Sequence, residues 1–432
     1  MIQELYNRAK IVIPGGNSLL SKRPEMFLPN GWPTYFESTS KIEIKDIEGR
    51  KFKDFSIMGV GTNILGYSNE QVDSAVMEVV RKGNLSSLNC AEEVYLAEKM
   101  LDLNPWASSV KYARTGGEAN AIAVRIARAA AKRDVVGICG YHGWHDWYLA
   151  SNLSSSEALA PHLLEGLSTS GVPKSLGSNS KTFQYGYFDQ FDELLKDSNL
   201  GVVIMEVARS AINIPFLEYV RKKCSEKEII LIFDECTSGF RETQAGLHSR
   251  IGINPDMAMF GKALGNGYAI NMVLGSSQVM KFAQDSFISS TFWSERIGPT
   301  AALATLKEME EQKSWEKITQ FGRYLRGKLD QVFTLHKLPV TFSGLIPLVA
   351  FNFNSKNNLK YKTFITQEML KKNYLAANLF ILSVYHSENE IDEFMNLFEP
   401  IIQIISECEN LGRNIDLLLD YPVCQSGFQR LN

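Results

Sequence analysis

The chain has 432 residues, of which 45% are hydrophobic and 22% charged, and its formal net charge is −3. These values are typical of a soluble globular protein with two or three structural units. They give no case for a nucleic acid or an anionic membrane as a partner, because neither sign of charge dominates. No apolar run approaches the ~20 residues of a membrane span, and the N-terminus lacks the apolar region of a signal peptide, so we expect a cytoplasmic protein.

The cysteines indicate neither a disulfide framework nor a zinc site. No two of them form a Cys-x-x-Cys pair, and most lie in apolar stretches. This usage is typical of reduced cytosolic thiols in a long chain. The six are Cys90, Cys139, Cys224, Cys236, Cys408 and Cys424.

The N-terminal segment, residues 1–50, begins with a short helical pattern and continues into the turn-rich stretch Pro14-Gly15-Gly16-Asn17. Lys41–Asp46 alternates apolar and charged residues, which predicts a half-exposed strand. Asp46-Ile-Glu-Gly49 then favours a turn. We expect this segment to join a smaller domain that the C-terminal part of the chain completes.

A large domain is expected over residues 51–300. From about residue 85, helical patterns alternate with short apolar runs, which predicts an α/β fold with a mostly parallel sheet and helices on both faces. In such sheets the site lies beyond the carboxyl ends of the strands. The predicted helices include Ala91–Leu103 and Ala119–Lys132, and the predicted strands include Val135–Cys139, Val202–Met205, Ile229–Phe233 and Met257–Phe260.

Residues 151–181 break this alternation, because they are rich in Ser, Leu and Gly and show no clear period. Such a stretch predicts a long loop, and long loops are often functional lids. Residues 301–432 predict a smaller α+β domain, with long helices over 298–329, strands within 339–354 and 378–384, and a closing helix over 388–412. The apolar residues of 422–432 favour docking on the protein surface, with a contribution to the substrate pocket as the alternative.

Polar and reactive side chains stand where the predicted strands end. One sheet edge is therefore expected to gather an amine, carboxylates, an aromatic ring and a Gly-rich helix start. These residues are Thr115, Gly116 and Gly117 before the helix Ala119–Lys132, Tyr141 and His142 after Val135–Cys139, Glu206 after Val202–Met205, Asp234 and Glu235 after Ile229–Phe233, and Lys262 after Met257–Phe260.

This set of residues suits pyridoxal 5'-phosphate. Backbone N–H groups at a Gly-rich helix start hold a phosphate. A carboxylate keeps the pyridine nitrogen protonated, an aromatic ring stacks on the pyridine, and a lysine forms a Schiff base. The apolar neighbours of Lys262, Phe260 and Leu264, predict a partly desolvated amine with a lowered pKa. Each feature alone is more often a cap, a turn or a solvated side chain, so the prediction rests on their co-occurrence.

Seven motifs carry a resemblance that runs from about residue 11 to about residue 400. They are Ile13-Pro-Gly-Gly16, Arg114-Thr-Gly-Gly-Glu-Ala119, Tyr141-His-Gly143, Met205-Glu206, Ile232-Phe-Asp-Glu-Cys-Thr-Ser-Gly-Phe-Arg241, Pro255-Asp-Met-Ala-Met-Phe-Gly-Lys262 and Ser290-Thr-Phe292. With these motifs the chain resembles the class III aminotransferases of fold type I, and among them the glutamate-1-semialdehyde aminomutases. The resemblance implies a seven-stranded type of large sheet, a smaller α+β domain built from both ends of the chain, and a gating loop at 151–181.

The resemblance also implies residue roles. Lys262 carries pyridoxal phosphate as a Schiff base and moves the substrate proton, and Asp234 keeps the pyridine nitrogen protonated. The active unit is implied to be a homodimer. The implied cofactor-binding residues are Thr115, Gly116 and Gly117 at the phosphate, Tyr141 and Cys236 on the two ring faces, His142 beside Tyr141, Glu206 near the ring edge, and Thr291 at the phosphate of the neighbouring subunit.

The phosphate-binding stretch departs from the family pattern at two positions. Gly117 stands where the family usually has a hydroxyl residue, so a side-chain hydrogen bond to the phosphate is lost. Arg114 replaces an asparagine and adds a cation. That cation either compensates at the phosphate or pairs with Glu118.

The N-terminal turn also departs from the pattern. Leu20 or Ser21 takes the place of the arginine that binds the substrate carboxylate in the aminomutases. Lys22 and Arg23 are close to that place but displaced from it. Glutamate-1-semialdehyde is therefore not the expected substrate.

The resemblance implies an aminotransferase that moves an amino group from a donor to an oxo acceptor, such as a sugar or a small aldehyde or ketone. The alternative is an aminomutase that shifts the amine within one substrate, and a decarboxylase or racemase is a weaker one. The intact Lys262 and Asp234 disfavour a binding protein without turnover. A metal site at His142, His145 and Asp146 is disfavoured, because their spacing matches no zinc pattern.

Overall fold

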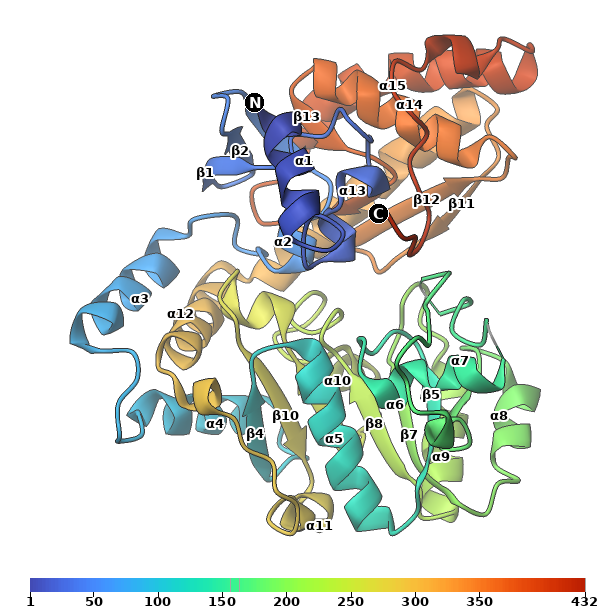
Figure 1. The fold of residues 1–432 in the computed structure, drawn as a ribbon. Helices are drawn as coiled ribbons and strands as arrows, with labels where there is room; N and C mark the ends of the chain where they lie inside the picture. The colour runs from blue at the N-terminus through green and yellow to red at the C-terminus, as the bar shows by residue number, and fades with distance from the viewer. Residues whose placement is uncertain (156, 163, 432) are drawn as a thin grey trace. The chain divides into compact units, whose positions relative to one another are not determined.

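The computed structural model describes residues 1–155, 157–162 and 164–431, and the chain divides into two compact units (Figure 1). One unit is Glu70–Trp315, and the other combines Met1–Asn69 with Glu316–Asn432. The fold is mixed α/β, with one large and mostly parallel sheet and two smaller sheets. The predicted fold class is therefore confirmed.

A seven-stranded sheet forms the centre of Glu70–Trp315, with the strand order β4-β10-β9-β8-β7-β5-β6. Its pairs from β9 to β6 are parallel, and β10 runs antiparallel to β9 and β4. The strands are Ser109–Ala113 (β4), Val135–Cys139 (β5), Ser180–Thr182 (β6), Leu200–Glu206 (β7), Ile230–Asp234 (β8), Met257–Phe260 (β9) and Asn271–Gly275 (β10). All four predicted strands are present. β7 begins two residues earlier and ends one residue later than predicted, at Glu206, and β8 is shifted by one residue towards the C-terminus.

The central strands have almost no exposed residues, because helices cover both faces of the sheet. Their continuous Val, Ile, Leu and Met runs are the pattern of strands buried on both sides. Figure 1 shows α5 lying across one face. The helices of this unit are Glu70–Lys82 (α3), Ala91–Leu103 (α4), Gly116–Ala131 (α5), Asp146–Leu149 (α6), Ser151–Ser154 (α7), Phe188–Leu194 (α8), Ile214–Glu226 (α9), Leu247–Ile251 (α10), Ser277–Met280 (α11) and Ile297–Gln312 (α12).

The segment 151–181 is more structured than its sequence predicts. It contains α7, a single 3₁₀ turn at Lys174–Leu176, and β6, which extends the sheet beside β5. Leu159 and His162 are buried. The prediction of a loop is wrong for these stretches, because elements of three or four residues are too short to show a period. Residues 156 and 163 lie outside the described part of the chain.

The other unit contains two smaller sheets, with the orders β1-β2-β3-β13 and β11-β12-β14. The parallel pairing of β3 with β13 joins the two ends of the chain, so residues 51–69 group with this unit and not with Glu70–Trp315. Its strands are Phe36–Ser40 (β1), Glu43–Asp46 (β2), Lys51–Phe55 (β3), Val340–Ser343 (β11), Leu348–Phe353 (β12), Tyr374–Ala376 (β13) and Leu379–Ile381 (β14). Its helices are Ile2–Val12 (α1), Met58–Gly61 (α2), Ser314–Leu335 (α13), Asn358–Lys371 (α14) and Glu388–Asn410 (α15).

The C-terminal end docks on its own unit, as its apolar residues predict. The backbone N–H of Cys424 donates to Thr363 Oγ1 at 2.9 Å, and that of Gln425 donates to the carbonyl of Glu25 at 2.7 Å. Arg23 donates to the carbonyl of Gln429 at 3.2 Å. Arg23, one of the two displaced cations of the N-terminal turn, is therefore engaged by the tail.

Candidate active site

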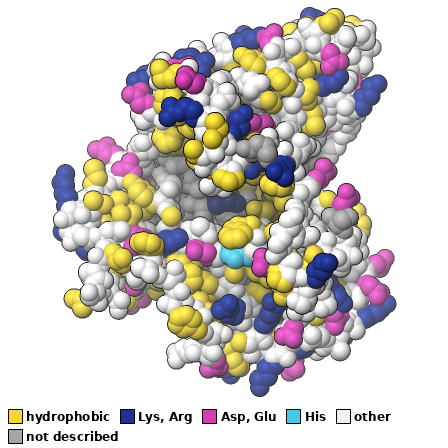
Figure 2. Space-filling model, in the orientation of Figure 1, with side chains coloured by type: hydrophobic (Ala, Val, Ile, Leu, Met, Phe, Trp, Pro, Cys, Tyr) yellow, Lys and Arg dark blue, Asp and Glu magenta, His cyan; other side chains and the backbone are white. Residues whose placement is uncertain are grey.

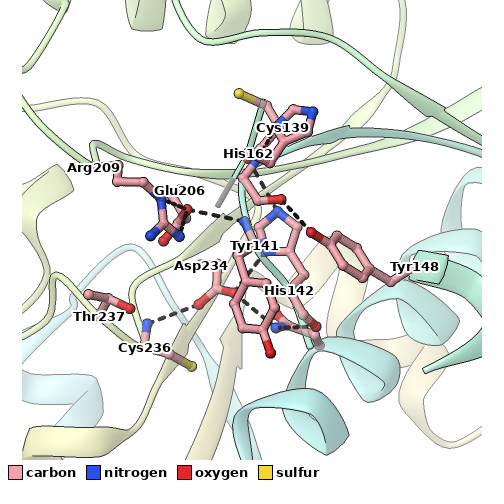
Figure 3. A network of polar contacts seen from close by, with 12 residues as sticks. Cys139, Tyr141, His142, Tyr148, His162, Glu206, Arg209, Asp234, Cys236 and Thr237 are labelled. Atoms are coloured by element: carbon pink, nitrogen blue, oxygen red, sulfur yellow. Dashed lines mark hydrogen bonds and ion pairs between the residues drawn. The ribbon is translucent and has the colours of Figure 1, made fainter. Parts of the chain in front are cut away.

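Four of the predicted site residues, Tyr141, His142, Glu206 and Asp234, meet at the carboxyl edge of β5, β7 and β8 (Figure 3). Glu206 and Asp234 are register partners at the ends of β7 and β8. The backbone N–H of Tyr141, two residues beyond β5, donates to Glu206 Oε2 at 3.2 Å. Lys262 follows β9 after a single glycine, Gly261. Parallel strands thus bring residues from positions 141 to 262 to one edge.

Asp234 is a buried carboxylate with three hydrogen-bond donors. Its Oδ2 accepts from Asn120 Nδ2 at 2.9 Å and faces His142 Nδ1 at 2.8 Å, and its Oδ1 accepts from the backbone N–H of Cys236 at 3.0 Å. Burial by itself raises the pKa of Asp234, but the hydrogen bond and charge of His142, together with the hydrogen bonds from Cys236 and Asn120, lower it to about 2. Asp234 is therefore ionised at neutral pH.

His142 is fully buried and uses both ring nitrogens. Its Nε2 lies 3.2 Å from the carbonyl oxygen of Cys139, which only accepts, so Nε2 carries a hydrogen. Its Nδ1 faces the ionised carboxylate of Asp234, which also only accepts. The ring thus bridges the carbonyl of Cys139 and the carboxylate of Asp234, and the His142–Asp234 pair is buried. This pair fixes the orientation of the carboxylate.

Lys262 presents a desolvated amine in a strained backbone position. Its φ is 45°, in the left-handed region that residues with a side chain seldom adopt outside functional sites. Its Nζ donates to Thr237 Oγ1 at 2.5 Å, and no carboxylate forms an ion pair with it among the residues described. Burial lowers the pKa of Lys262. The amine of Lys262 is therefore more easily deprotonated than the amine of an exposed lysine.

The start of α5 is built to present backbone N–H groups. Thr115 caps the helix: its Oγ1 accepts from the N–H of Glu118 at 3.4 Å, while Glu118 Oε2 accepts from the N–H of Thr115 at 2.9 Å. Gly116 and Gly117 are the first two residues of the helix, so no carbonyl within it reaches their N–H groups. A Cβ at Gly116 would meet nothing nearer than 3.6 Å. This open cradle fits a phosphate.

His145 stands beside this helix start. A Cβ at Gly117 would lie 2.9 Å from His145 Nδ1 and Cε1, so the imidazole fills the space of the missing side chain. His145 Nδ1 is buried and has no hydrogen-bond partner in the described part of the chain. A buried polar atom without a partner is uncommon, and its place next to the two glycines suits a bound anion. Both observations fit pyridoxal phosphate at this edge.

The Arg114 side chain does not pair with Glu118, which was one of the two sequence-based alternatives. Its guanidinium pairs with Glu295 at 3.0 Å and donates to the carbonyls of Trp293 and Glu295 at 2.9 and 3.1 Å. Arg114 reaches Glu118 only through its backbone N–H, and not through its guanidinium. Arg114 therefore holds the stretch 293–295 beside the start of α5, because its fork of donors matches the carbonyls and the carboxylate together.

Two further predicted cofactor residues are Thr291 and Cys236. Thr291 is exposed at the start of a 3₁₀ turn, Thr291–Ser294. Cys236 is buried, and its Sγ lies 3.6 Å from Asn271 Oδ1. Burial raises the pKa of the Cys236 thiol well above its usual range, so the thiol behaves as a small apolar group.

The sequence-based prediction missed five polar residues around the site: Asn120, Tyr148, His162, Arg209 and Thr237. Asn120 was detectable, because it is a lone amide on the buried face of α5, one turn after Gly117. Thr237 lies inside the quoted motif but carries no periodicity signal. Arg209 follows β7 on a connecting stretch, where sequence gives little information about position.

No group of three His, Cys, Asp or Glu side chains in the described ranges is arranged to hold a metal ion. No helix in these ranges is long and apolar enough to span a membrane.

Comparison with known proteins gives a consistent family. The sequence model of the class-III aminotransferases matches residues 32–373. A 3-aminobutyryl-CoA aminotransferase of Cloacimonas acidaminovorans is 29% identical over 88% of this chain and 90% of its own length. A glutamate-1-semialdehyde 2,1-aminomutase of Methanococcoides burtonii is 28% identical over 92% and 97%. The FumI protein of Sphingopyxis sp. MTA144, solved in a pyridoxal-phosphate form, shares the fold with a TM-score of 0.84 at 23% identity, over 97% of this chain and 99% of that one.

Proposed function

Since the chain belongs to the class-III aminotransferases and is a pyridoxal-phosphate-dependent enzyme, we propose that it transfers an amino group from a donor to an oxo acceptor with Lys262 as the catalytic amine. One observation carries the proposal. The amine of the half-buried Lys262, without a carboxylate partner among the described residues, shares a sheet edge with the ionised Asp234 and an open helix start.

We assign the other residues by the same geometry. The bound cofactor supplies an electron sink that makes a hydrogen on the amine-bearing carbon acidic. Asp234, kept ionised by His142, would hold the pyridine nitrogen protonated. Lys262 Nζ would take the acidic hydrogen and return it to a neighbouring carbon, which needs a neutral amine and so a lowered pKa.

The binding roles rest on what each residue presents. The N–H groups of Gly116 and Gly117, behind the capped Thr115, would hold the phosphate. Tyr141 and Cys236 would cover the two faces of the ring. Glu206 would order hydrogen bonds near the ring edge, since its Oε2 already accepts from the N–H of Tyr141.

The oxo acceptor is proposed to be a sugar or a small aldehyde or ketone. An aminomutase that shifts the amine within one substrate is the second candidate, supported by the relative of that name in Methanococcoides burtonii. The N-terminal turn argues for the first. It offers Leu20 or Ser21 where the aminomutases have an arginine, and Arg23 is engaged by the tail.

The test is to incubate the purified enzyme, loaded with pyridoxal phosphate, with L-glutamate and no acceptor. Transamination predicts release of 2-oxoglutarate, up to one equivalent per site, with loss of the cofactor's visible absorbance. An enzyme that shifts amines within one molecule would show no release. A positive result with L-alanine in place of L-glutamate would identify a different donor but the same reaction.

The active unit is proposed to be a homodimer, with Thr291 acting at the partner's phosphate. Support comes from an apolar surface on Glu70–Trp315, part of which Figure 2 shows in the region of α3. Hydrogen bonds of Arg296 to Asn84 and Glu92 hold its parts together. Its exposed residues are Met77, Val80, Leu85, Leu88, Val94, Tyr95 and Phe292. Exposed apolar side chains gathered in this way are typical of a protein interface.

Two further expectations stay proposals. Residues 151–181 are proposed to gate the site, because His162 on this segment accepts a hydrogen bond from the N–H of Gly140 at 3.0 Å, next to Tyr141. A cytoplasmic location is supported by the six free cysteines.

A further inference from the structure

Amino donors of the amino-acid type carry a carboxylate, so their binding favours a nearby cation. Three cations of Glu70–Trp315 near the site are committed elsewhere. Lys262 is the reacting amine, and Arg114 pairs with Glu295. Arg241 is completely buried, and its Nε donates to the carbonyl of Thr237. A fourth cation, Arg209, has none of these commitments.

Arg209 lies at the reacting edge of the sheet. It is three residues beyond Glu206, which ends β7 beside the end of β8 and Asp234. Its guanidinium donates from Nε and Nη2 to Glu206 Oε2, with the Nε distance 2.9 Å. The same oxygen accepts from the N–H of Tyr141 at 3.2 Å, so one atom separates the guanidinium from the stacking residue (Figure 3).

The guanidinium keeps one complete binding edge open. An arginine has five N–H donors, and the two bonds to Glu206 use the Nε edge. The opposite edge, formed by Nη1 and the second hydrogen of Nη2, has no partner among the described residues and is the edge that binds a carboxylate in bidentate geometry. Arg209 is 37% exposed whereas Glu206 is 9% exposed, so this edge is accessible while its anchor is buried.

The charge of Arg209 reaches the site residues. Burial raises the pKa of the Tyr141 phenol, and the positive charge of Arg209 opposes that rise. Burial, together with the charges of His142 and Arg209, lowers the pKa of His162 to about 4. Glu206 thus holds Arg209 in place without cancelling its field.

We propose that Arg209 binds the carboxylate of the amino donor through its Nη1–Nη2 edge while Glu206 holds its Nε edge, so that Arg209 determines the enzyme's preference for amino acids over simple amines. The proposal rests on the proposed transamination. In this arrangement, Arg209 after β7 binds the carboxylate. The N-terminal turn has Leu20 or Ser21 at the place where the resemblance implies a carboxylate-binding arginine.

The test compares two donors that differ only in the carboxylate. Isopropylamine has the skeleton of L-alanine with a methyl group in place of the carboxylate. The loss of cofactor absorbance is followed by stopped flow at rising donor concentration, for wild type, Arg209→Gln, Arg209→Lys and Arg413→Gln. Arg413 is the matched control, because it is 44% exposed and pairs with Glu407 at the end of α15.

The expected result is that Arg209→Gln raises the half-saturating concentration of L-alanine roughly ten- to a hundredfold and leaves that of isopropylamine unchanged. Arg209→Lys should restore part of the loss, and Arg413→Gln should change neither. L-glutamate replaces L-alanine as the carboxylate donor if wild type prefers it. Unaltered melting temperature and cofactor absorbance would show that Arg209→Gln is folded and loaded.

Equal losses with both donors would overturn the inference, since Arg209 would then act only by holding Glu206. Unchanged binding of the carboxylate donors in Arg209→Gln would also overturn it. A wild-type enzyme whose cofactor absorbance responds to none of the three donors would overturn the proposed transamination instead.

Discussion

Asp234 and Glu235 are adjacent carboxylates with opposite surroundings. Successive side chains of an extended chain point to opposite sides, so the two diverge at the end of β8. Asp234 faces the site. Glu235 is fully buried, and its Oε1 accepts from both Nδ1 and the backbone N–H of His248 at 2.8 Å. Trp106 Nε1 donates to the other nitrogen of that ring at 2.8 Å, so His248 is neutral and the network is structural.

This contrast predicts separate consequences for two conservative variants. Asp234→Asn should fold normally but lower turnover by roughly a hundredfold or more, because an amide does not keep a pyridine nitrogen protonated. Glu235→Gln should keep turnover within a few-fold but lower the free energy of unfolding by about 1–3 kcal/mol, since its NH₂ group would face donors. Urea unfolding and steady-state turnover measure the two effects. An active Asp234→Asn would contradict the assignment of that carboxylate.

At this scale the sequence predicts residues that are tied to strand ends. Asp234 and Lys262 were found because an apolar run fixes where its strand stops. Arg209 was not, because the stretch after β7 has no period and its guanidinium is positioned by a tertiary contact with Glu206. Thr237 was missed for a similar reason. Its hydroxyl accepts a hydrogen bond from the Lys262 amine only in the folded protein, where the backbone conformation of Lys262 brings the two groups together.

At the scale of elements, Gly117 at the start of α5 is a departure from the family pattern. From the sequence alone, this departure implied only the loss of a side-chain hydrogen bond to the phosphate. The resemblance implies a hydroxyl residue at the position of Gly117, and the His145 ring occupies the space that such a side chain would fill. The two positions therefore have to be compatible with each other. Restoring the side chain without removing the ring would place Cβ 2.9 Å from the imidazole.

We expect Gly117→Thr to weaken pyridoxal phosphate binding about tenfold, because overpacking costs about 1–3 kcal/mol. Gly117→Thr combined with His145→Ala should recover most of that loss, since the hydroxyl then has room to face the phosphate. The dissociation constant is measured by titrating cofactor-free protein and following absorbance. Strictly additive effects of the two substitutions would contradict the predicted steric coupling.

The segment 151–181 is tied to β5 through a titratable contact. His162 Nδ1 accepts from the N–H of Gly140, which requires a neutral ring. Burial, with the charges of His142 and Arg209, lowers the pKa of His162 to about 4, below the ~6.5 of an unfolded histidine. The unfolded chain therefore binds more protons between these values. The stabilisation is complete above about pH 6.5 and is lost as the pH falls towards 4.

His162→Gln should remove this pH dependence, since an amide oxygen accepts the same hydrogen bond without titrating. The free energy of unfolding of wild type, relative to the variant, should fall by at most about 1.4 kcal/mol for each pH unit below 6.5. Urea unfolding at pH 7.5, 6.0 and 5.0 measures the difference. Parallel curves for the two proteins would show that folding does not change the pKa of His162.

At the scale of the molecule, local patterns predicted the parallel sheet but not the division of the chain. The alternation of helices with apolar runs is local and indicates the sheet directly. The grouping of residues 51–69 depends on β3 pairing with β13, more than 300 positions away, and no local pattern encodes that pairing. The apolar surface with Leu88 and Phe292 is also a property of the folded unit, because its residues come from separate segments.

The proposed homodimer makes a prediction that a monomer does not share. The exposed Thr291 makes no side-chain hydrogen bond to a site residue in the described part of its own chain, so it should complete the site of a second 48.5 kDa chain. Lys262→Ala removes the reacting amine, and Thr291→Asp places a charge against the phosphate. Each variant alone should be nearly inactive at limiting cofactor, because both sites of its dimer carry the defect.

Co-expression of the two variants should restore activity. In a hybrid dimer the chain with an intact Lys262 receives Thr291 from the Lys262→Ala chain, so one of its two sites is complete. Random pairing makes half of the dimers hybrid, which gives roughly a quarter of the wild-type turnover. Mixing the purified variants without subunit exchange is the control and should restore nothing. If Thr291 served its own chain, every site in the hybrid would lack one group, and co-expression would leave the preparation inactive.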